Sequence, residues 1–165
     1  MIDITAKVKE DIHYAVTVDD IKAYEATFGP IPDGAFVALR TDWYKRWPDM
    51  NALSGLDEEG GENFPGWSME ALKYIYEERN AAANGHKTLD TDTSVLAGEA
   101  GDLAYERYVL DKSKLQVEVL CNFDKVAPRR RSCDGILPPH RRCDRTACES
   151  LGDYGVIGLI FYYFY

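Results

Sequence analysis

The sequence predicts a domain of the α/β or α+β class, because stretches with a helical period alternate with short apolar stretches typical of strands. Three stretches support this most clearly: the helical pattern at 17–29, the apolar run "AFVALRT" at 35–41 and the alternating run "LQVEVL" at 115–120. With 165 residues, of which 45% are hydrophobic, the chain has the size of one ordinary domain with a buried core.

The chain opens with a predicted strand and helix. "MIDITA" at 1–6 suits a short strand. Thr17 is the expected N-cap of the next helix, with Asp20 three residues later to complete a capping box. The apolar face of this helix consists of Ile21, Tyr24 and Phe28.

The two best strand candidates differ in pattern. After a turn at "PIPDG", residues 35–41 are apolar without polar alternation, which is typical of a strand buried on both faces. Residues 115–120 alternate instead, so that one face of the strand consists of Gln116, Glu118 and Leu120.

A polar loop and a helix lie between these strands. The loop "DEEGGENFPGW" ends at Ser68, a suitable N-cap for a helix through "MEALKYIYEERNAAA". Asn84 and Gly85 are expected to close this helix, because both residue types favour a helix C-terminus.

The stretch "NGHKTLDTD" at 84–92 has neither a helical nor a strand period. His86, Asp90 and Asp92 are metal-ligand residue types, which suggests a metal site. Asp and Thr side chains also close turns by bonding the nearby backbone, so a hydrogen-bonded turn is the alternative.

Charge and cysteine content change near Pro128. Residues 1–128 contain 13 basic and 24 acidic side chains, whereas residues 129–165 contain six and four. Three of the four cysteines also lie in the second segment. We therefore expect the chain to consist of two parts, 1–128 and 129–165, that differ in origin as they do in composition.

The overall charge of −9 excludes some classes of partner. An acidic surface repels phosphates, so neither nucleic acid nor an anionic membrane is expected to bind. The apolar run "VIGLIFYYFY" is too short to span a bilayer, and no secretory leader opens the sequence, so we expect a cytoplasmic protein with reduced thiols.

Four motifs, taken in order, resemble the C-terminal half of the metal-dependent cyclase family, which includes kynurenine formamidases and isatin hydrolases. They are "GAFVALRTDW", "FPG" before a capped helix, "GHKTLDTD" and "VEVLCNFDKV". The resemblance covers nearly all of residues 1–128. It implies an α/β fold, as part of a swivelling β/β/α-type domain with a mixed sheet and flanking helices. It also implies a homo-oligomer that hydrolyses a small formamide or cyclic amide.

The resemblance assigns roles to particular residues. Glu118 matches a family glutamate near the metal and the scissile group, and Glu106, twelve residues earlier, occupies the position of a family histidine. The alternative is an exposed strand residue for Glu118 and a surface charge for Glu106. The residues expected to line the substrate pocket are Trp43, His86, Thr88 and Asp92.

The family holds zinc or manganese with a His-x-Gly-Thr-His-x-Asp-x-Pro motif, which places imidazoles and a carboxylate around an open position for water. The three histidines of this chain, His13, His86 and His140, belong to no such motif. The resemblance places that motif upstream of Met1. We therefore expect a truncated chain that holds no metal and is inactive alone.

The segment after Pro128 departs from the family. It contains a Cys3His set of zinc-ligand types, Cys133, His140, Cys143 and Cys148, whose spacing fits no zinc module we can name. We favour a shifted reading frame, because codons compatible with this segment also encode a family-like ending in another frame. DNA sequencing across Pro128 tests this: the same in-frame tail in several isolates would contradict it.

Three function classes follow from the sequence. The first is a cyclase-family hydrolase fragment. The second is a non-catalytic remnant that associates with a full-length homologue. The third is a small zinc-binding interaction module built on the cysteine-rich tail.

Overall fold

The computed structural model describes residues 1–129 except 102, 119, 121–123 and 125–126. Its main sheet has four strands in the order β1-β3-β5-β6, and the three pairings are parallel. These strands are β1 (Ile2–Asp3), β3 (Phe36–Arg40), β5 (Ala83–Gly85) and β6 (Leu115–Val117). A second, two-stranded parallel sheet pairs β2 (Ala15–Val16) with β4 (Gly66–Trp67).

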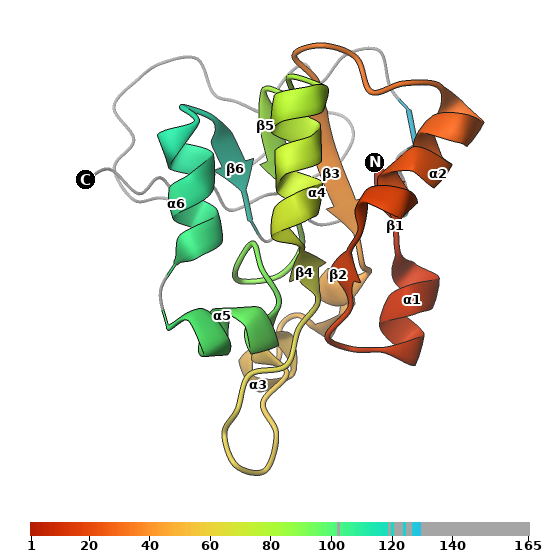
Figure 1. Ribbon diagram of the computed structural model, residues 1–165. Coiled ribbons are helices and arrows are strands. Elements are labelled where there is room, and N and C mark those ends of the chain that lie inside the picture. The colour runs from red at the N-terminus through yellow and green to blue at the C-terminus, as the bar shows by residue number, and fades with distance from the viewer. Residues whose placement is uncertain (102, 119, 121–123, 125–126, 130–165) are drawn as a thin grey trace, which may run out of the picture.

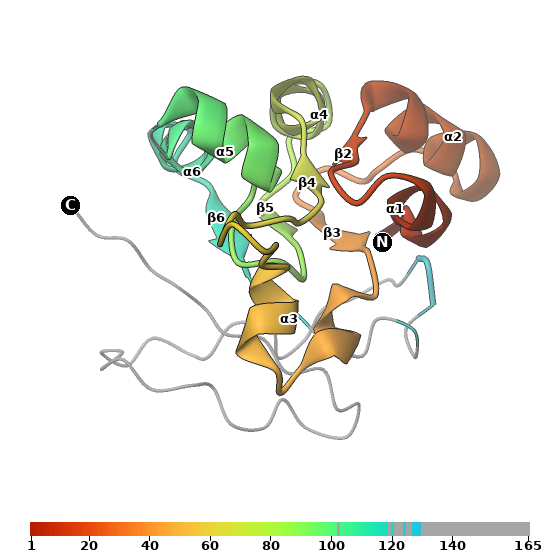
Figure 2. The ribbon, with the colours of Figure 1, turned by 90° about the horizontal axis from the view of Figure 1, so that it is seen from below.

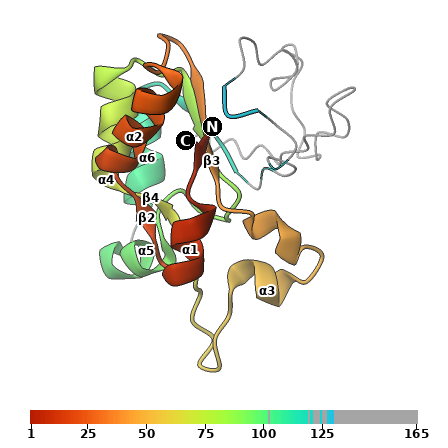
Figure 3. The same ribbon diagram turned by 90° about the vertical axis from the view of Figure 1, so that its right-hand side faces the viewer.

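One face of the main sheet is covered by helices (Figures 1 and 3). The helices on this face are α2 (Val18–Phe28), α4 (Met69–Lys73), which continues as the π-helical turn η2 (Tyr74–Glu78), and α6 (Ala104–Asp111). Two short helices, α1 (Thr5–Glu10) and α5 (Ser94–Ala100), lie near the second sheet. An arm formed by the 3₁₀ helix η1 (Trp43–Arg46) and α3 (Met50–Ser54) projects on the other side of the sheet (Figures 2 and 3).

The core lies between this helical layer and the sheet. Ile21 of α2, Leu39 of β3 and Leu72 of α4 have no exposed surface, and Trp67 and Ile75 are equally buried. Full burial of one such side chain contributes about 1.5–3 kcal/mol relative to leaving it in water. This packing fixes the helices against the sheet and thereby positions the carboxyl ends of the strands.

Several local predictions are confirmed. The Thr17 side chain accepts a hydrogen bond from the Asp20 backbone N–H, and the Asp20 side chain accepts one from the Thr17 backbone, which completes the capping box. Ser68 caps α4 by accepting from the Ala71 N–H. Strand β3 is buried at its three central residues, as its unbroken apolar pattern predicts.

The predicted end of the helix after Ser68 is wrong. The helical segment ends at Glu78, and Asn80 has a positive φ of 47°, which reverses the chain. Asn84 and Gly85 lie instead in β5, the strand that pairs with both β3 and β6. A β-carbon at Gly85 would lie 2.5 Å from Phe36 Cζ, so close packing between strands, and not helix capping, accounts for this glycine.

One other prediction needs correction. The strand at 1–6 is reduced to two residues, because Thr5 begins α1. The α/β class with flanking helices is confirmed, and every strand pairing among the described residues is parallel. None of the helices in the described part of the chain is long and apolar enough to cross a membrane.

Candidate active site

The carboxyl ends of β3, β5 and β6 meet at one edge of the sheet, toward the lower half of Figure 1. In parallel α/β sheets this edge is where ligands usually bind. Asp42 follows β3, His86 and Lys87 follow β5, and Glu118 follows β6. Three segments that are far apart in the sequence therefore bring polar side chains to one place.

The segment after β5 is buried and tightly held. Its residues His86, Lys87, Thr88, Thr91 and Asp92 are at most 1% exposed. The His86 backbone donates to Val117 O (3.0 Å), and its carbonyl accepts from the Leu120 N–H (2.9 Å). Hydrogen bonds hold this segment, as one interpretation of the sequence predicted, and it lies beside Glu106, to which the Thr91 N–H donates.

The other end of this segment is fixed by β4. The Trp67 N–H donates to Thr91 O over 2.7 Å. A β-carbon at Gly66 would lie 2.3 Å from the carbonyl carbon and oxygen of Asp92, so only glycine allows this approach.

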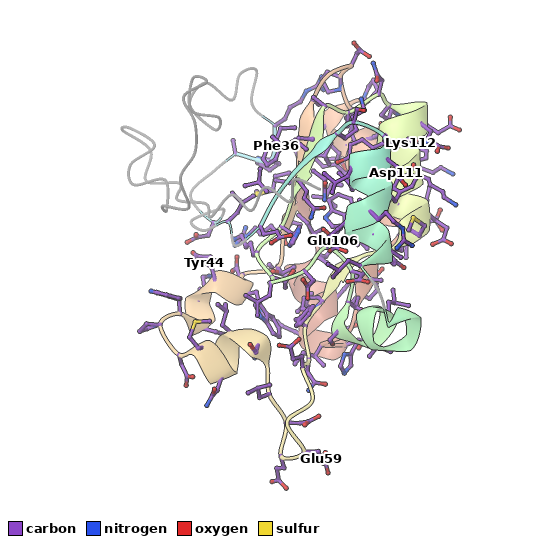
Figure 4. All side chains as sticks on the ribbon, turned by 90° about the vertical axis from the view of Figure 1, so that its left-hand side faces the viewer. Phe36, Tyr44, Glu59, Glu106, Asp111 and Lys112 are labelled. Atoms are coloured by element: carbon purple, nitrogen blue, oxygen red, sulfur yellow. The ribbon has the colours of Figure 1, made fainter. Side chains whose placement is uncertain are left out.

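Glu106 and Glu118 are both buried in this region, with 3% and 4% exposure. This corrects the alternative interpretation of the two residues as surface charges. Glu118 Oε1 accepts a hydrogen bond from Gln116 Nε2 (3.0 Å), and Glu106 Oε1 accepts one from the Thr91 backbone N–H (2.9 Å). Glu106 Oε2 is buried and has no hydrogen-bond partner. Figure 4 shows Glu106 near the middle of the molecule, whereas Glu59 lies at the tip of an exposed loop.

Burial, together with the nearby carboxyl groups of Asp90 and Glu106, raises the pKa of Glu118 to about 8, while the hydrogen bond from Gln116 opposes this rise. The pKa of Asp90 is likewise raised, to about 6, mainly by burial and then by Glu106. At neutral pH Glu118 therefore carries a proton that it can donate. Glu118 and Asp90 therefore differ in pKa, and such a difference between neighbouring carboxyl groups is a common basis of acid–base catalysis.

His86 is neutral, because complete burial lowers its pKa to about 3. Its Nδ1 lies 3.1 Å from the Thr88 hydroxyl and its Nε2 lies 3.3 Å from the Thr91 hydroxyl. Both ring nitrogens thus face hydroxyl groups of the same segment, so His86 is held inside this buried segment.

Lys87 was not predicted from the sequence. Its side chain is fully buried, with Nζ 4.2 Å from the centroid of the Tyr44 ring and 3.7 Å from Asp42 Oδ1. Burial lowers its pKa to about 8, while Asp42 opposes that change. Lys87 thereby connects the segment after β5 to the arm after β3.

The remaining predicted pocket residues occupy different surroundings. Trp43 packs with Leu53 and Phe64 in the core of the arm, and its Nε1 donates to Leu53 O (2.6 Å). Thr88 and Asp92 lie in the buried segment with His86. Contact of these side chains with a substrate stays a prediction.

The described residues do not by themselves form a metal site. They contain no group of three or more His, Cys, Asp or Glu side chains that could hold an ion. The Cys133, His140, Cys143 and Cys148 set lies outside the described residues. The orphan oxygen of Glu106 is an acceptor, but one such oxygen is not a coordination sphere.

An α/β domain with two buried carboxyl groups at the carboxyl edge of its sheet defines a site suited to acid–base chemistry on a small molecule. Residues 1–93 match the model of the Cyclase family, described as "Putative cyclase". The chain belongs to this family.

Several isatin hydrolases are similar to this chain. The isatin hydrolase of Roseibium aggregatum is 35% identical over 103 residues, which cover 62% of this chain and 37% of that enzyme. The structure of isatin hydrolase A from Ralstonia solanacearum aligns with a TM-score of 0.71 and 35% identity, over 78% of this chain and 48% of that one. The structure of isatin hydrolase A from Labrenzia aggregata, bound to benzyl benzoate, aligns with a TM-score of 0.69 and 27% identity. This alignment covers 77% of this chain and 48% of that one. The chain thus spans about half the length of the solved relatives.

Proposed function

We propose that this chain supplies the acid–base part of an amide hydrolase site that opens a cyclic amide such as isatin. The observation that carries the proposal is the burial of Glu118 and Glu106 at the carboxyl edge of the sheet, which raises the pKa of Glu118 to about 8. The names of the relatives support a cyclic amide as the substrate class.

The two carboxyl groups suit the two proton transfers of amide hydrolysis. Water adds to the carbonyl carbon and loses a proton, for which Glu106 Oε2 is a buried acceptor without another partner. The C–N bond then breaks, and the leaving nitrogen takes a proton from the Glu118 carboxylic acid. In a ring the products, a carboxylate and an aryl amine, remain in one molecule.

Hydrolases of the cyclase family depend on a metal, which polarises the carbonyl group and lowers the pKa of bound water. Because the described residues form no metal site alone, we assign none of the steps above to a metal. The family's His-x-Gly-Thr-His-x-Asp-x-Pro motif does not occur in these 165 residues. We therefore expect turnover only in a protein that contains both this chain and that motif.

The second candidate reaction is hydrolysis of an N-formyl arylamine, as in kynurenine formamidases, because it needs the same two proton transfers. The named relatives make the cyclic amide the better supported substrate. A non-catalytic role beside a full-length homologue is the alternative if no turnover occurs. A zinc module would depend on residues 130–165, outside the described part.

The test compares two proteins on two substrates. The first protein is the 165-residue chain, and the second is the same chain fused to the part of the R. solanacearum isatin hydrolase that it does not match. Ring opening of isatin and hydrolysis of N-formylkynurenine are followed by absorbance with Zn²⁺ or Mn²⁺ present. We expect the fusion to open isatin and the short chain to be inactive. Metal-dependent turnover by the short chain would contradict the second expectation, and activity on N-formylkynurenine alone would contradict the substrate assignment.

A further inference from the structure

Glu106 and Glu118 are linked by a chain of hydrogen bonds that the proposed reaction does not use directly. Thr91 stands at its centre. Its backbone N–H donates to Glu106 Oε1 (2.9 Å), and its hydroxyl donates to Gln116 Oε1 (2.8 Å). Gln116 in turn donates from Nε2 to Glu118 Oε1 (3.0 Å). Thr91 has no exposed surface and Gln116 is 5% exposed, so water does not compete for these bonds.

We propose that Thr91 and Gln116 are positioning residues that hold the Glu118 carboxyl group by one oxygen and leave its proton on the other. The inference rests on the proposed function for its catalytic consequence, but the hydrogen-bond arrangement can be tested without turnover.

The Gln116 amide bridges Thr91 and Glu118. An amide can present either its oxygen or its NH₂ group to a neighbour, and hydrogen bonding selects one orientation. Because Thr91 donates to Gln116 Oε1, the NH₂ group faces Glu118. Glu118 Oε1 is then occupied as an acceptor, so the acidic proton belongs on Oε2.

His86 lies directly behind Thr91, with Nε2 3.3 Å from Thr91 Oγ1. Its Nδ1 lies 3.1 Å from the hydroxyl of Thr88, which donates its own proton to Asp90 O (3.0 Å). The buried segment after β5 thus fixes Thr91 from behind.

The chain offers well-matched variants for a test. Thr91→Val removes the hydroxyl but keeps the shape and the backbone N–H that binds Glu106. Thr91→Ser restores a hydroxyl. Thr93→Val is the matched control, because Thr93 is 1% exposed in the same part of the chain and its hydroxyl accepts from the Leu96 N–H (3.3 Å), not from the Glu118 network.

The measurement is the pKa of Glu118 in the 165-residue chain, from carboxyl ¹³C shifts with the resonance assigned by Glu118→Gln. Asp90 and Glu106 face Glu118 in all these variants, so their effect is common to them. Without the Thr91 hydroxyl, Gln116 no longer holds its NH₂ group toward the carboxylate, which loses a donor. We expect Thr91→Val to raise the pKa of Glu118 by about one unit, and Thr91→Ser and Thr93→Val to leave it unchanged.

An unchanged pKa in folded Thr91→Val, or the same rise in Thr93→Val, would overturn the proposal. If Thr91→Val does not fold, Gln116→Met removes the same donor and is expected to give the same rise. The proposed function can fail separately from this inference. If Glu118→Gln leaves turnover of the fusion protein intact while Thr91→Val still raises the pKa of Glu118, Thr91 and Gln116 position Glu118 but Glu118 is not the proton donor.

Discussion

At the scale of single residues, the protonated Glu118 links the candidate site to stability. Its pKa is about 8 in the folded chain against 4.5 for an ordinary glutamate. A carboxyl group with a raised folded pKa stabilises the fold fully below pH 4.5 and loses that contribution as the pH rises through 8. Glu118→Gln cannot ionise, so it is expected to be more stable than the wild type at pH 8, by a few kcal/mol, and to match it near pH 4.5.

Thermal unfolding of the two proteins between pH 4.5 and 8.5 measures this difference. His86 destabilises both equally at low pH, because its neutral form is favoured in the fold, and so cancels. Glu10→Gln, at an exposed position, is the control and is expected to follow the wild type. Parallel curves for Glu118→Gln and the wild type would show that Glu118 is ionised at neutral pH.

From the sequence, only those residues of the candidate site could be predicted that lie in or near a family-like motif. Glu106 and Glu118 were identified through their spacing in family-like motifs, and both prove to be buried. Lys87, Thr91 and Gln116 were missed as site residues, because sequence does not show that a polar side chain is buried or what it contacts. The one usable signal was the period-2 pattern of "LQVEVL", which places Gln116 and Glu118 on the same face of a strand.

At the scale of elements, the close contact between β4 and the segment after β5 is expected to contribute to the free energy of unfolding. Gly66→Ala would place a β-carbon 2.3 Å from backbone atoms of Asp92, which must move. Overpacking of this kind costs about 1–3 kcal/mol. We expect this loss in urea denaturation, together with shifted NMR signals for Thr91 and Glu106.

Gly98→Ala is the matched control for that substitution. Gly98 lies in α5, and a β-carbon there would meet nothing within 4 Å. Alanine is favoured over glycine in a helix by about 1 kcal/mol, so this variant should be neutral or more stable. Equal destabilisation by both substitutions would mean that the close approach at Gly66 is not what matters.

The elements themselves were predictable where local chemistry decides them. The capping box at Thr17 and the apolar run of β3 need only neighbouring residues, and both are confirmed. Strand β5 was mistaken for the end of a helix, because "AAANG" has helical composition and only its pairing with β3 and β6 makes it a strand. Helices α3, α5 and α6 are short, and their sequences carry weak signals.

At the scale of the whole molecule, the chain contributes about half the length of its solved relatives and a coherent part of their fold. The division into 1–128 and 129–165 stays a prediction. The described chain does return beside α2 at this boundary, where the Tyr24 hydroxyl donates to Pro128 O (3.1 Å). Residues 1–128 bring two buried carboxyl groups, Glu106 and Glu118, to the carboxyl edge of the sheet, and we propose that they act as an acid–base pair. A metal-binding part would complete the proposed site.

The most direct test of this account is the turnover rate of isatin ring opening by the fusion protein with and without Glu118, with bound metal measured in the same samples. We predict that Glu118→Gln lowers kcat at least about 100-fold while the metal content stays unchanged, because an amide has the shape of the acid but cannot donate its proton to the leaving nitrogen. Glu10→Gln should be fully active. Undiminished turnover by Glu118→Gln would contradict the central claim that this chain supplies the proton donor.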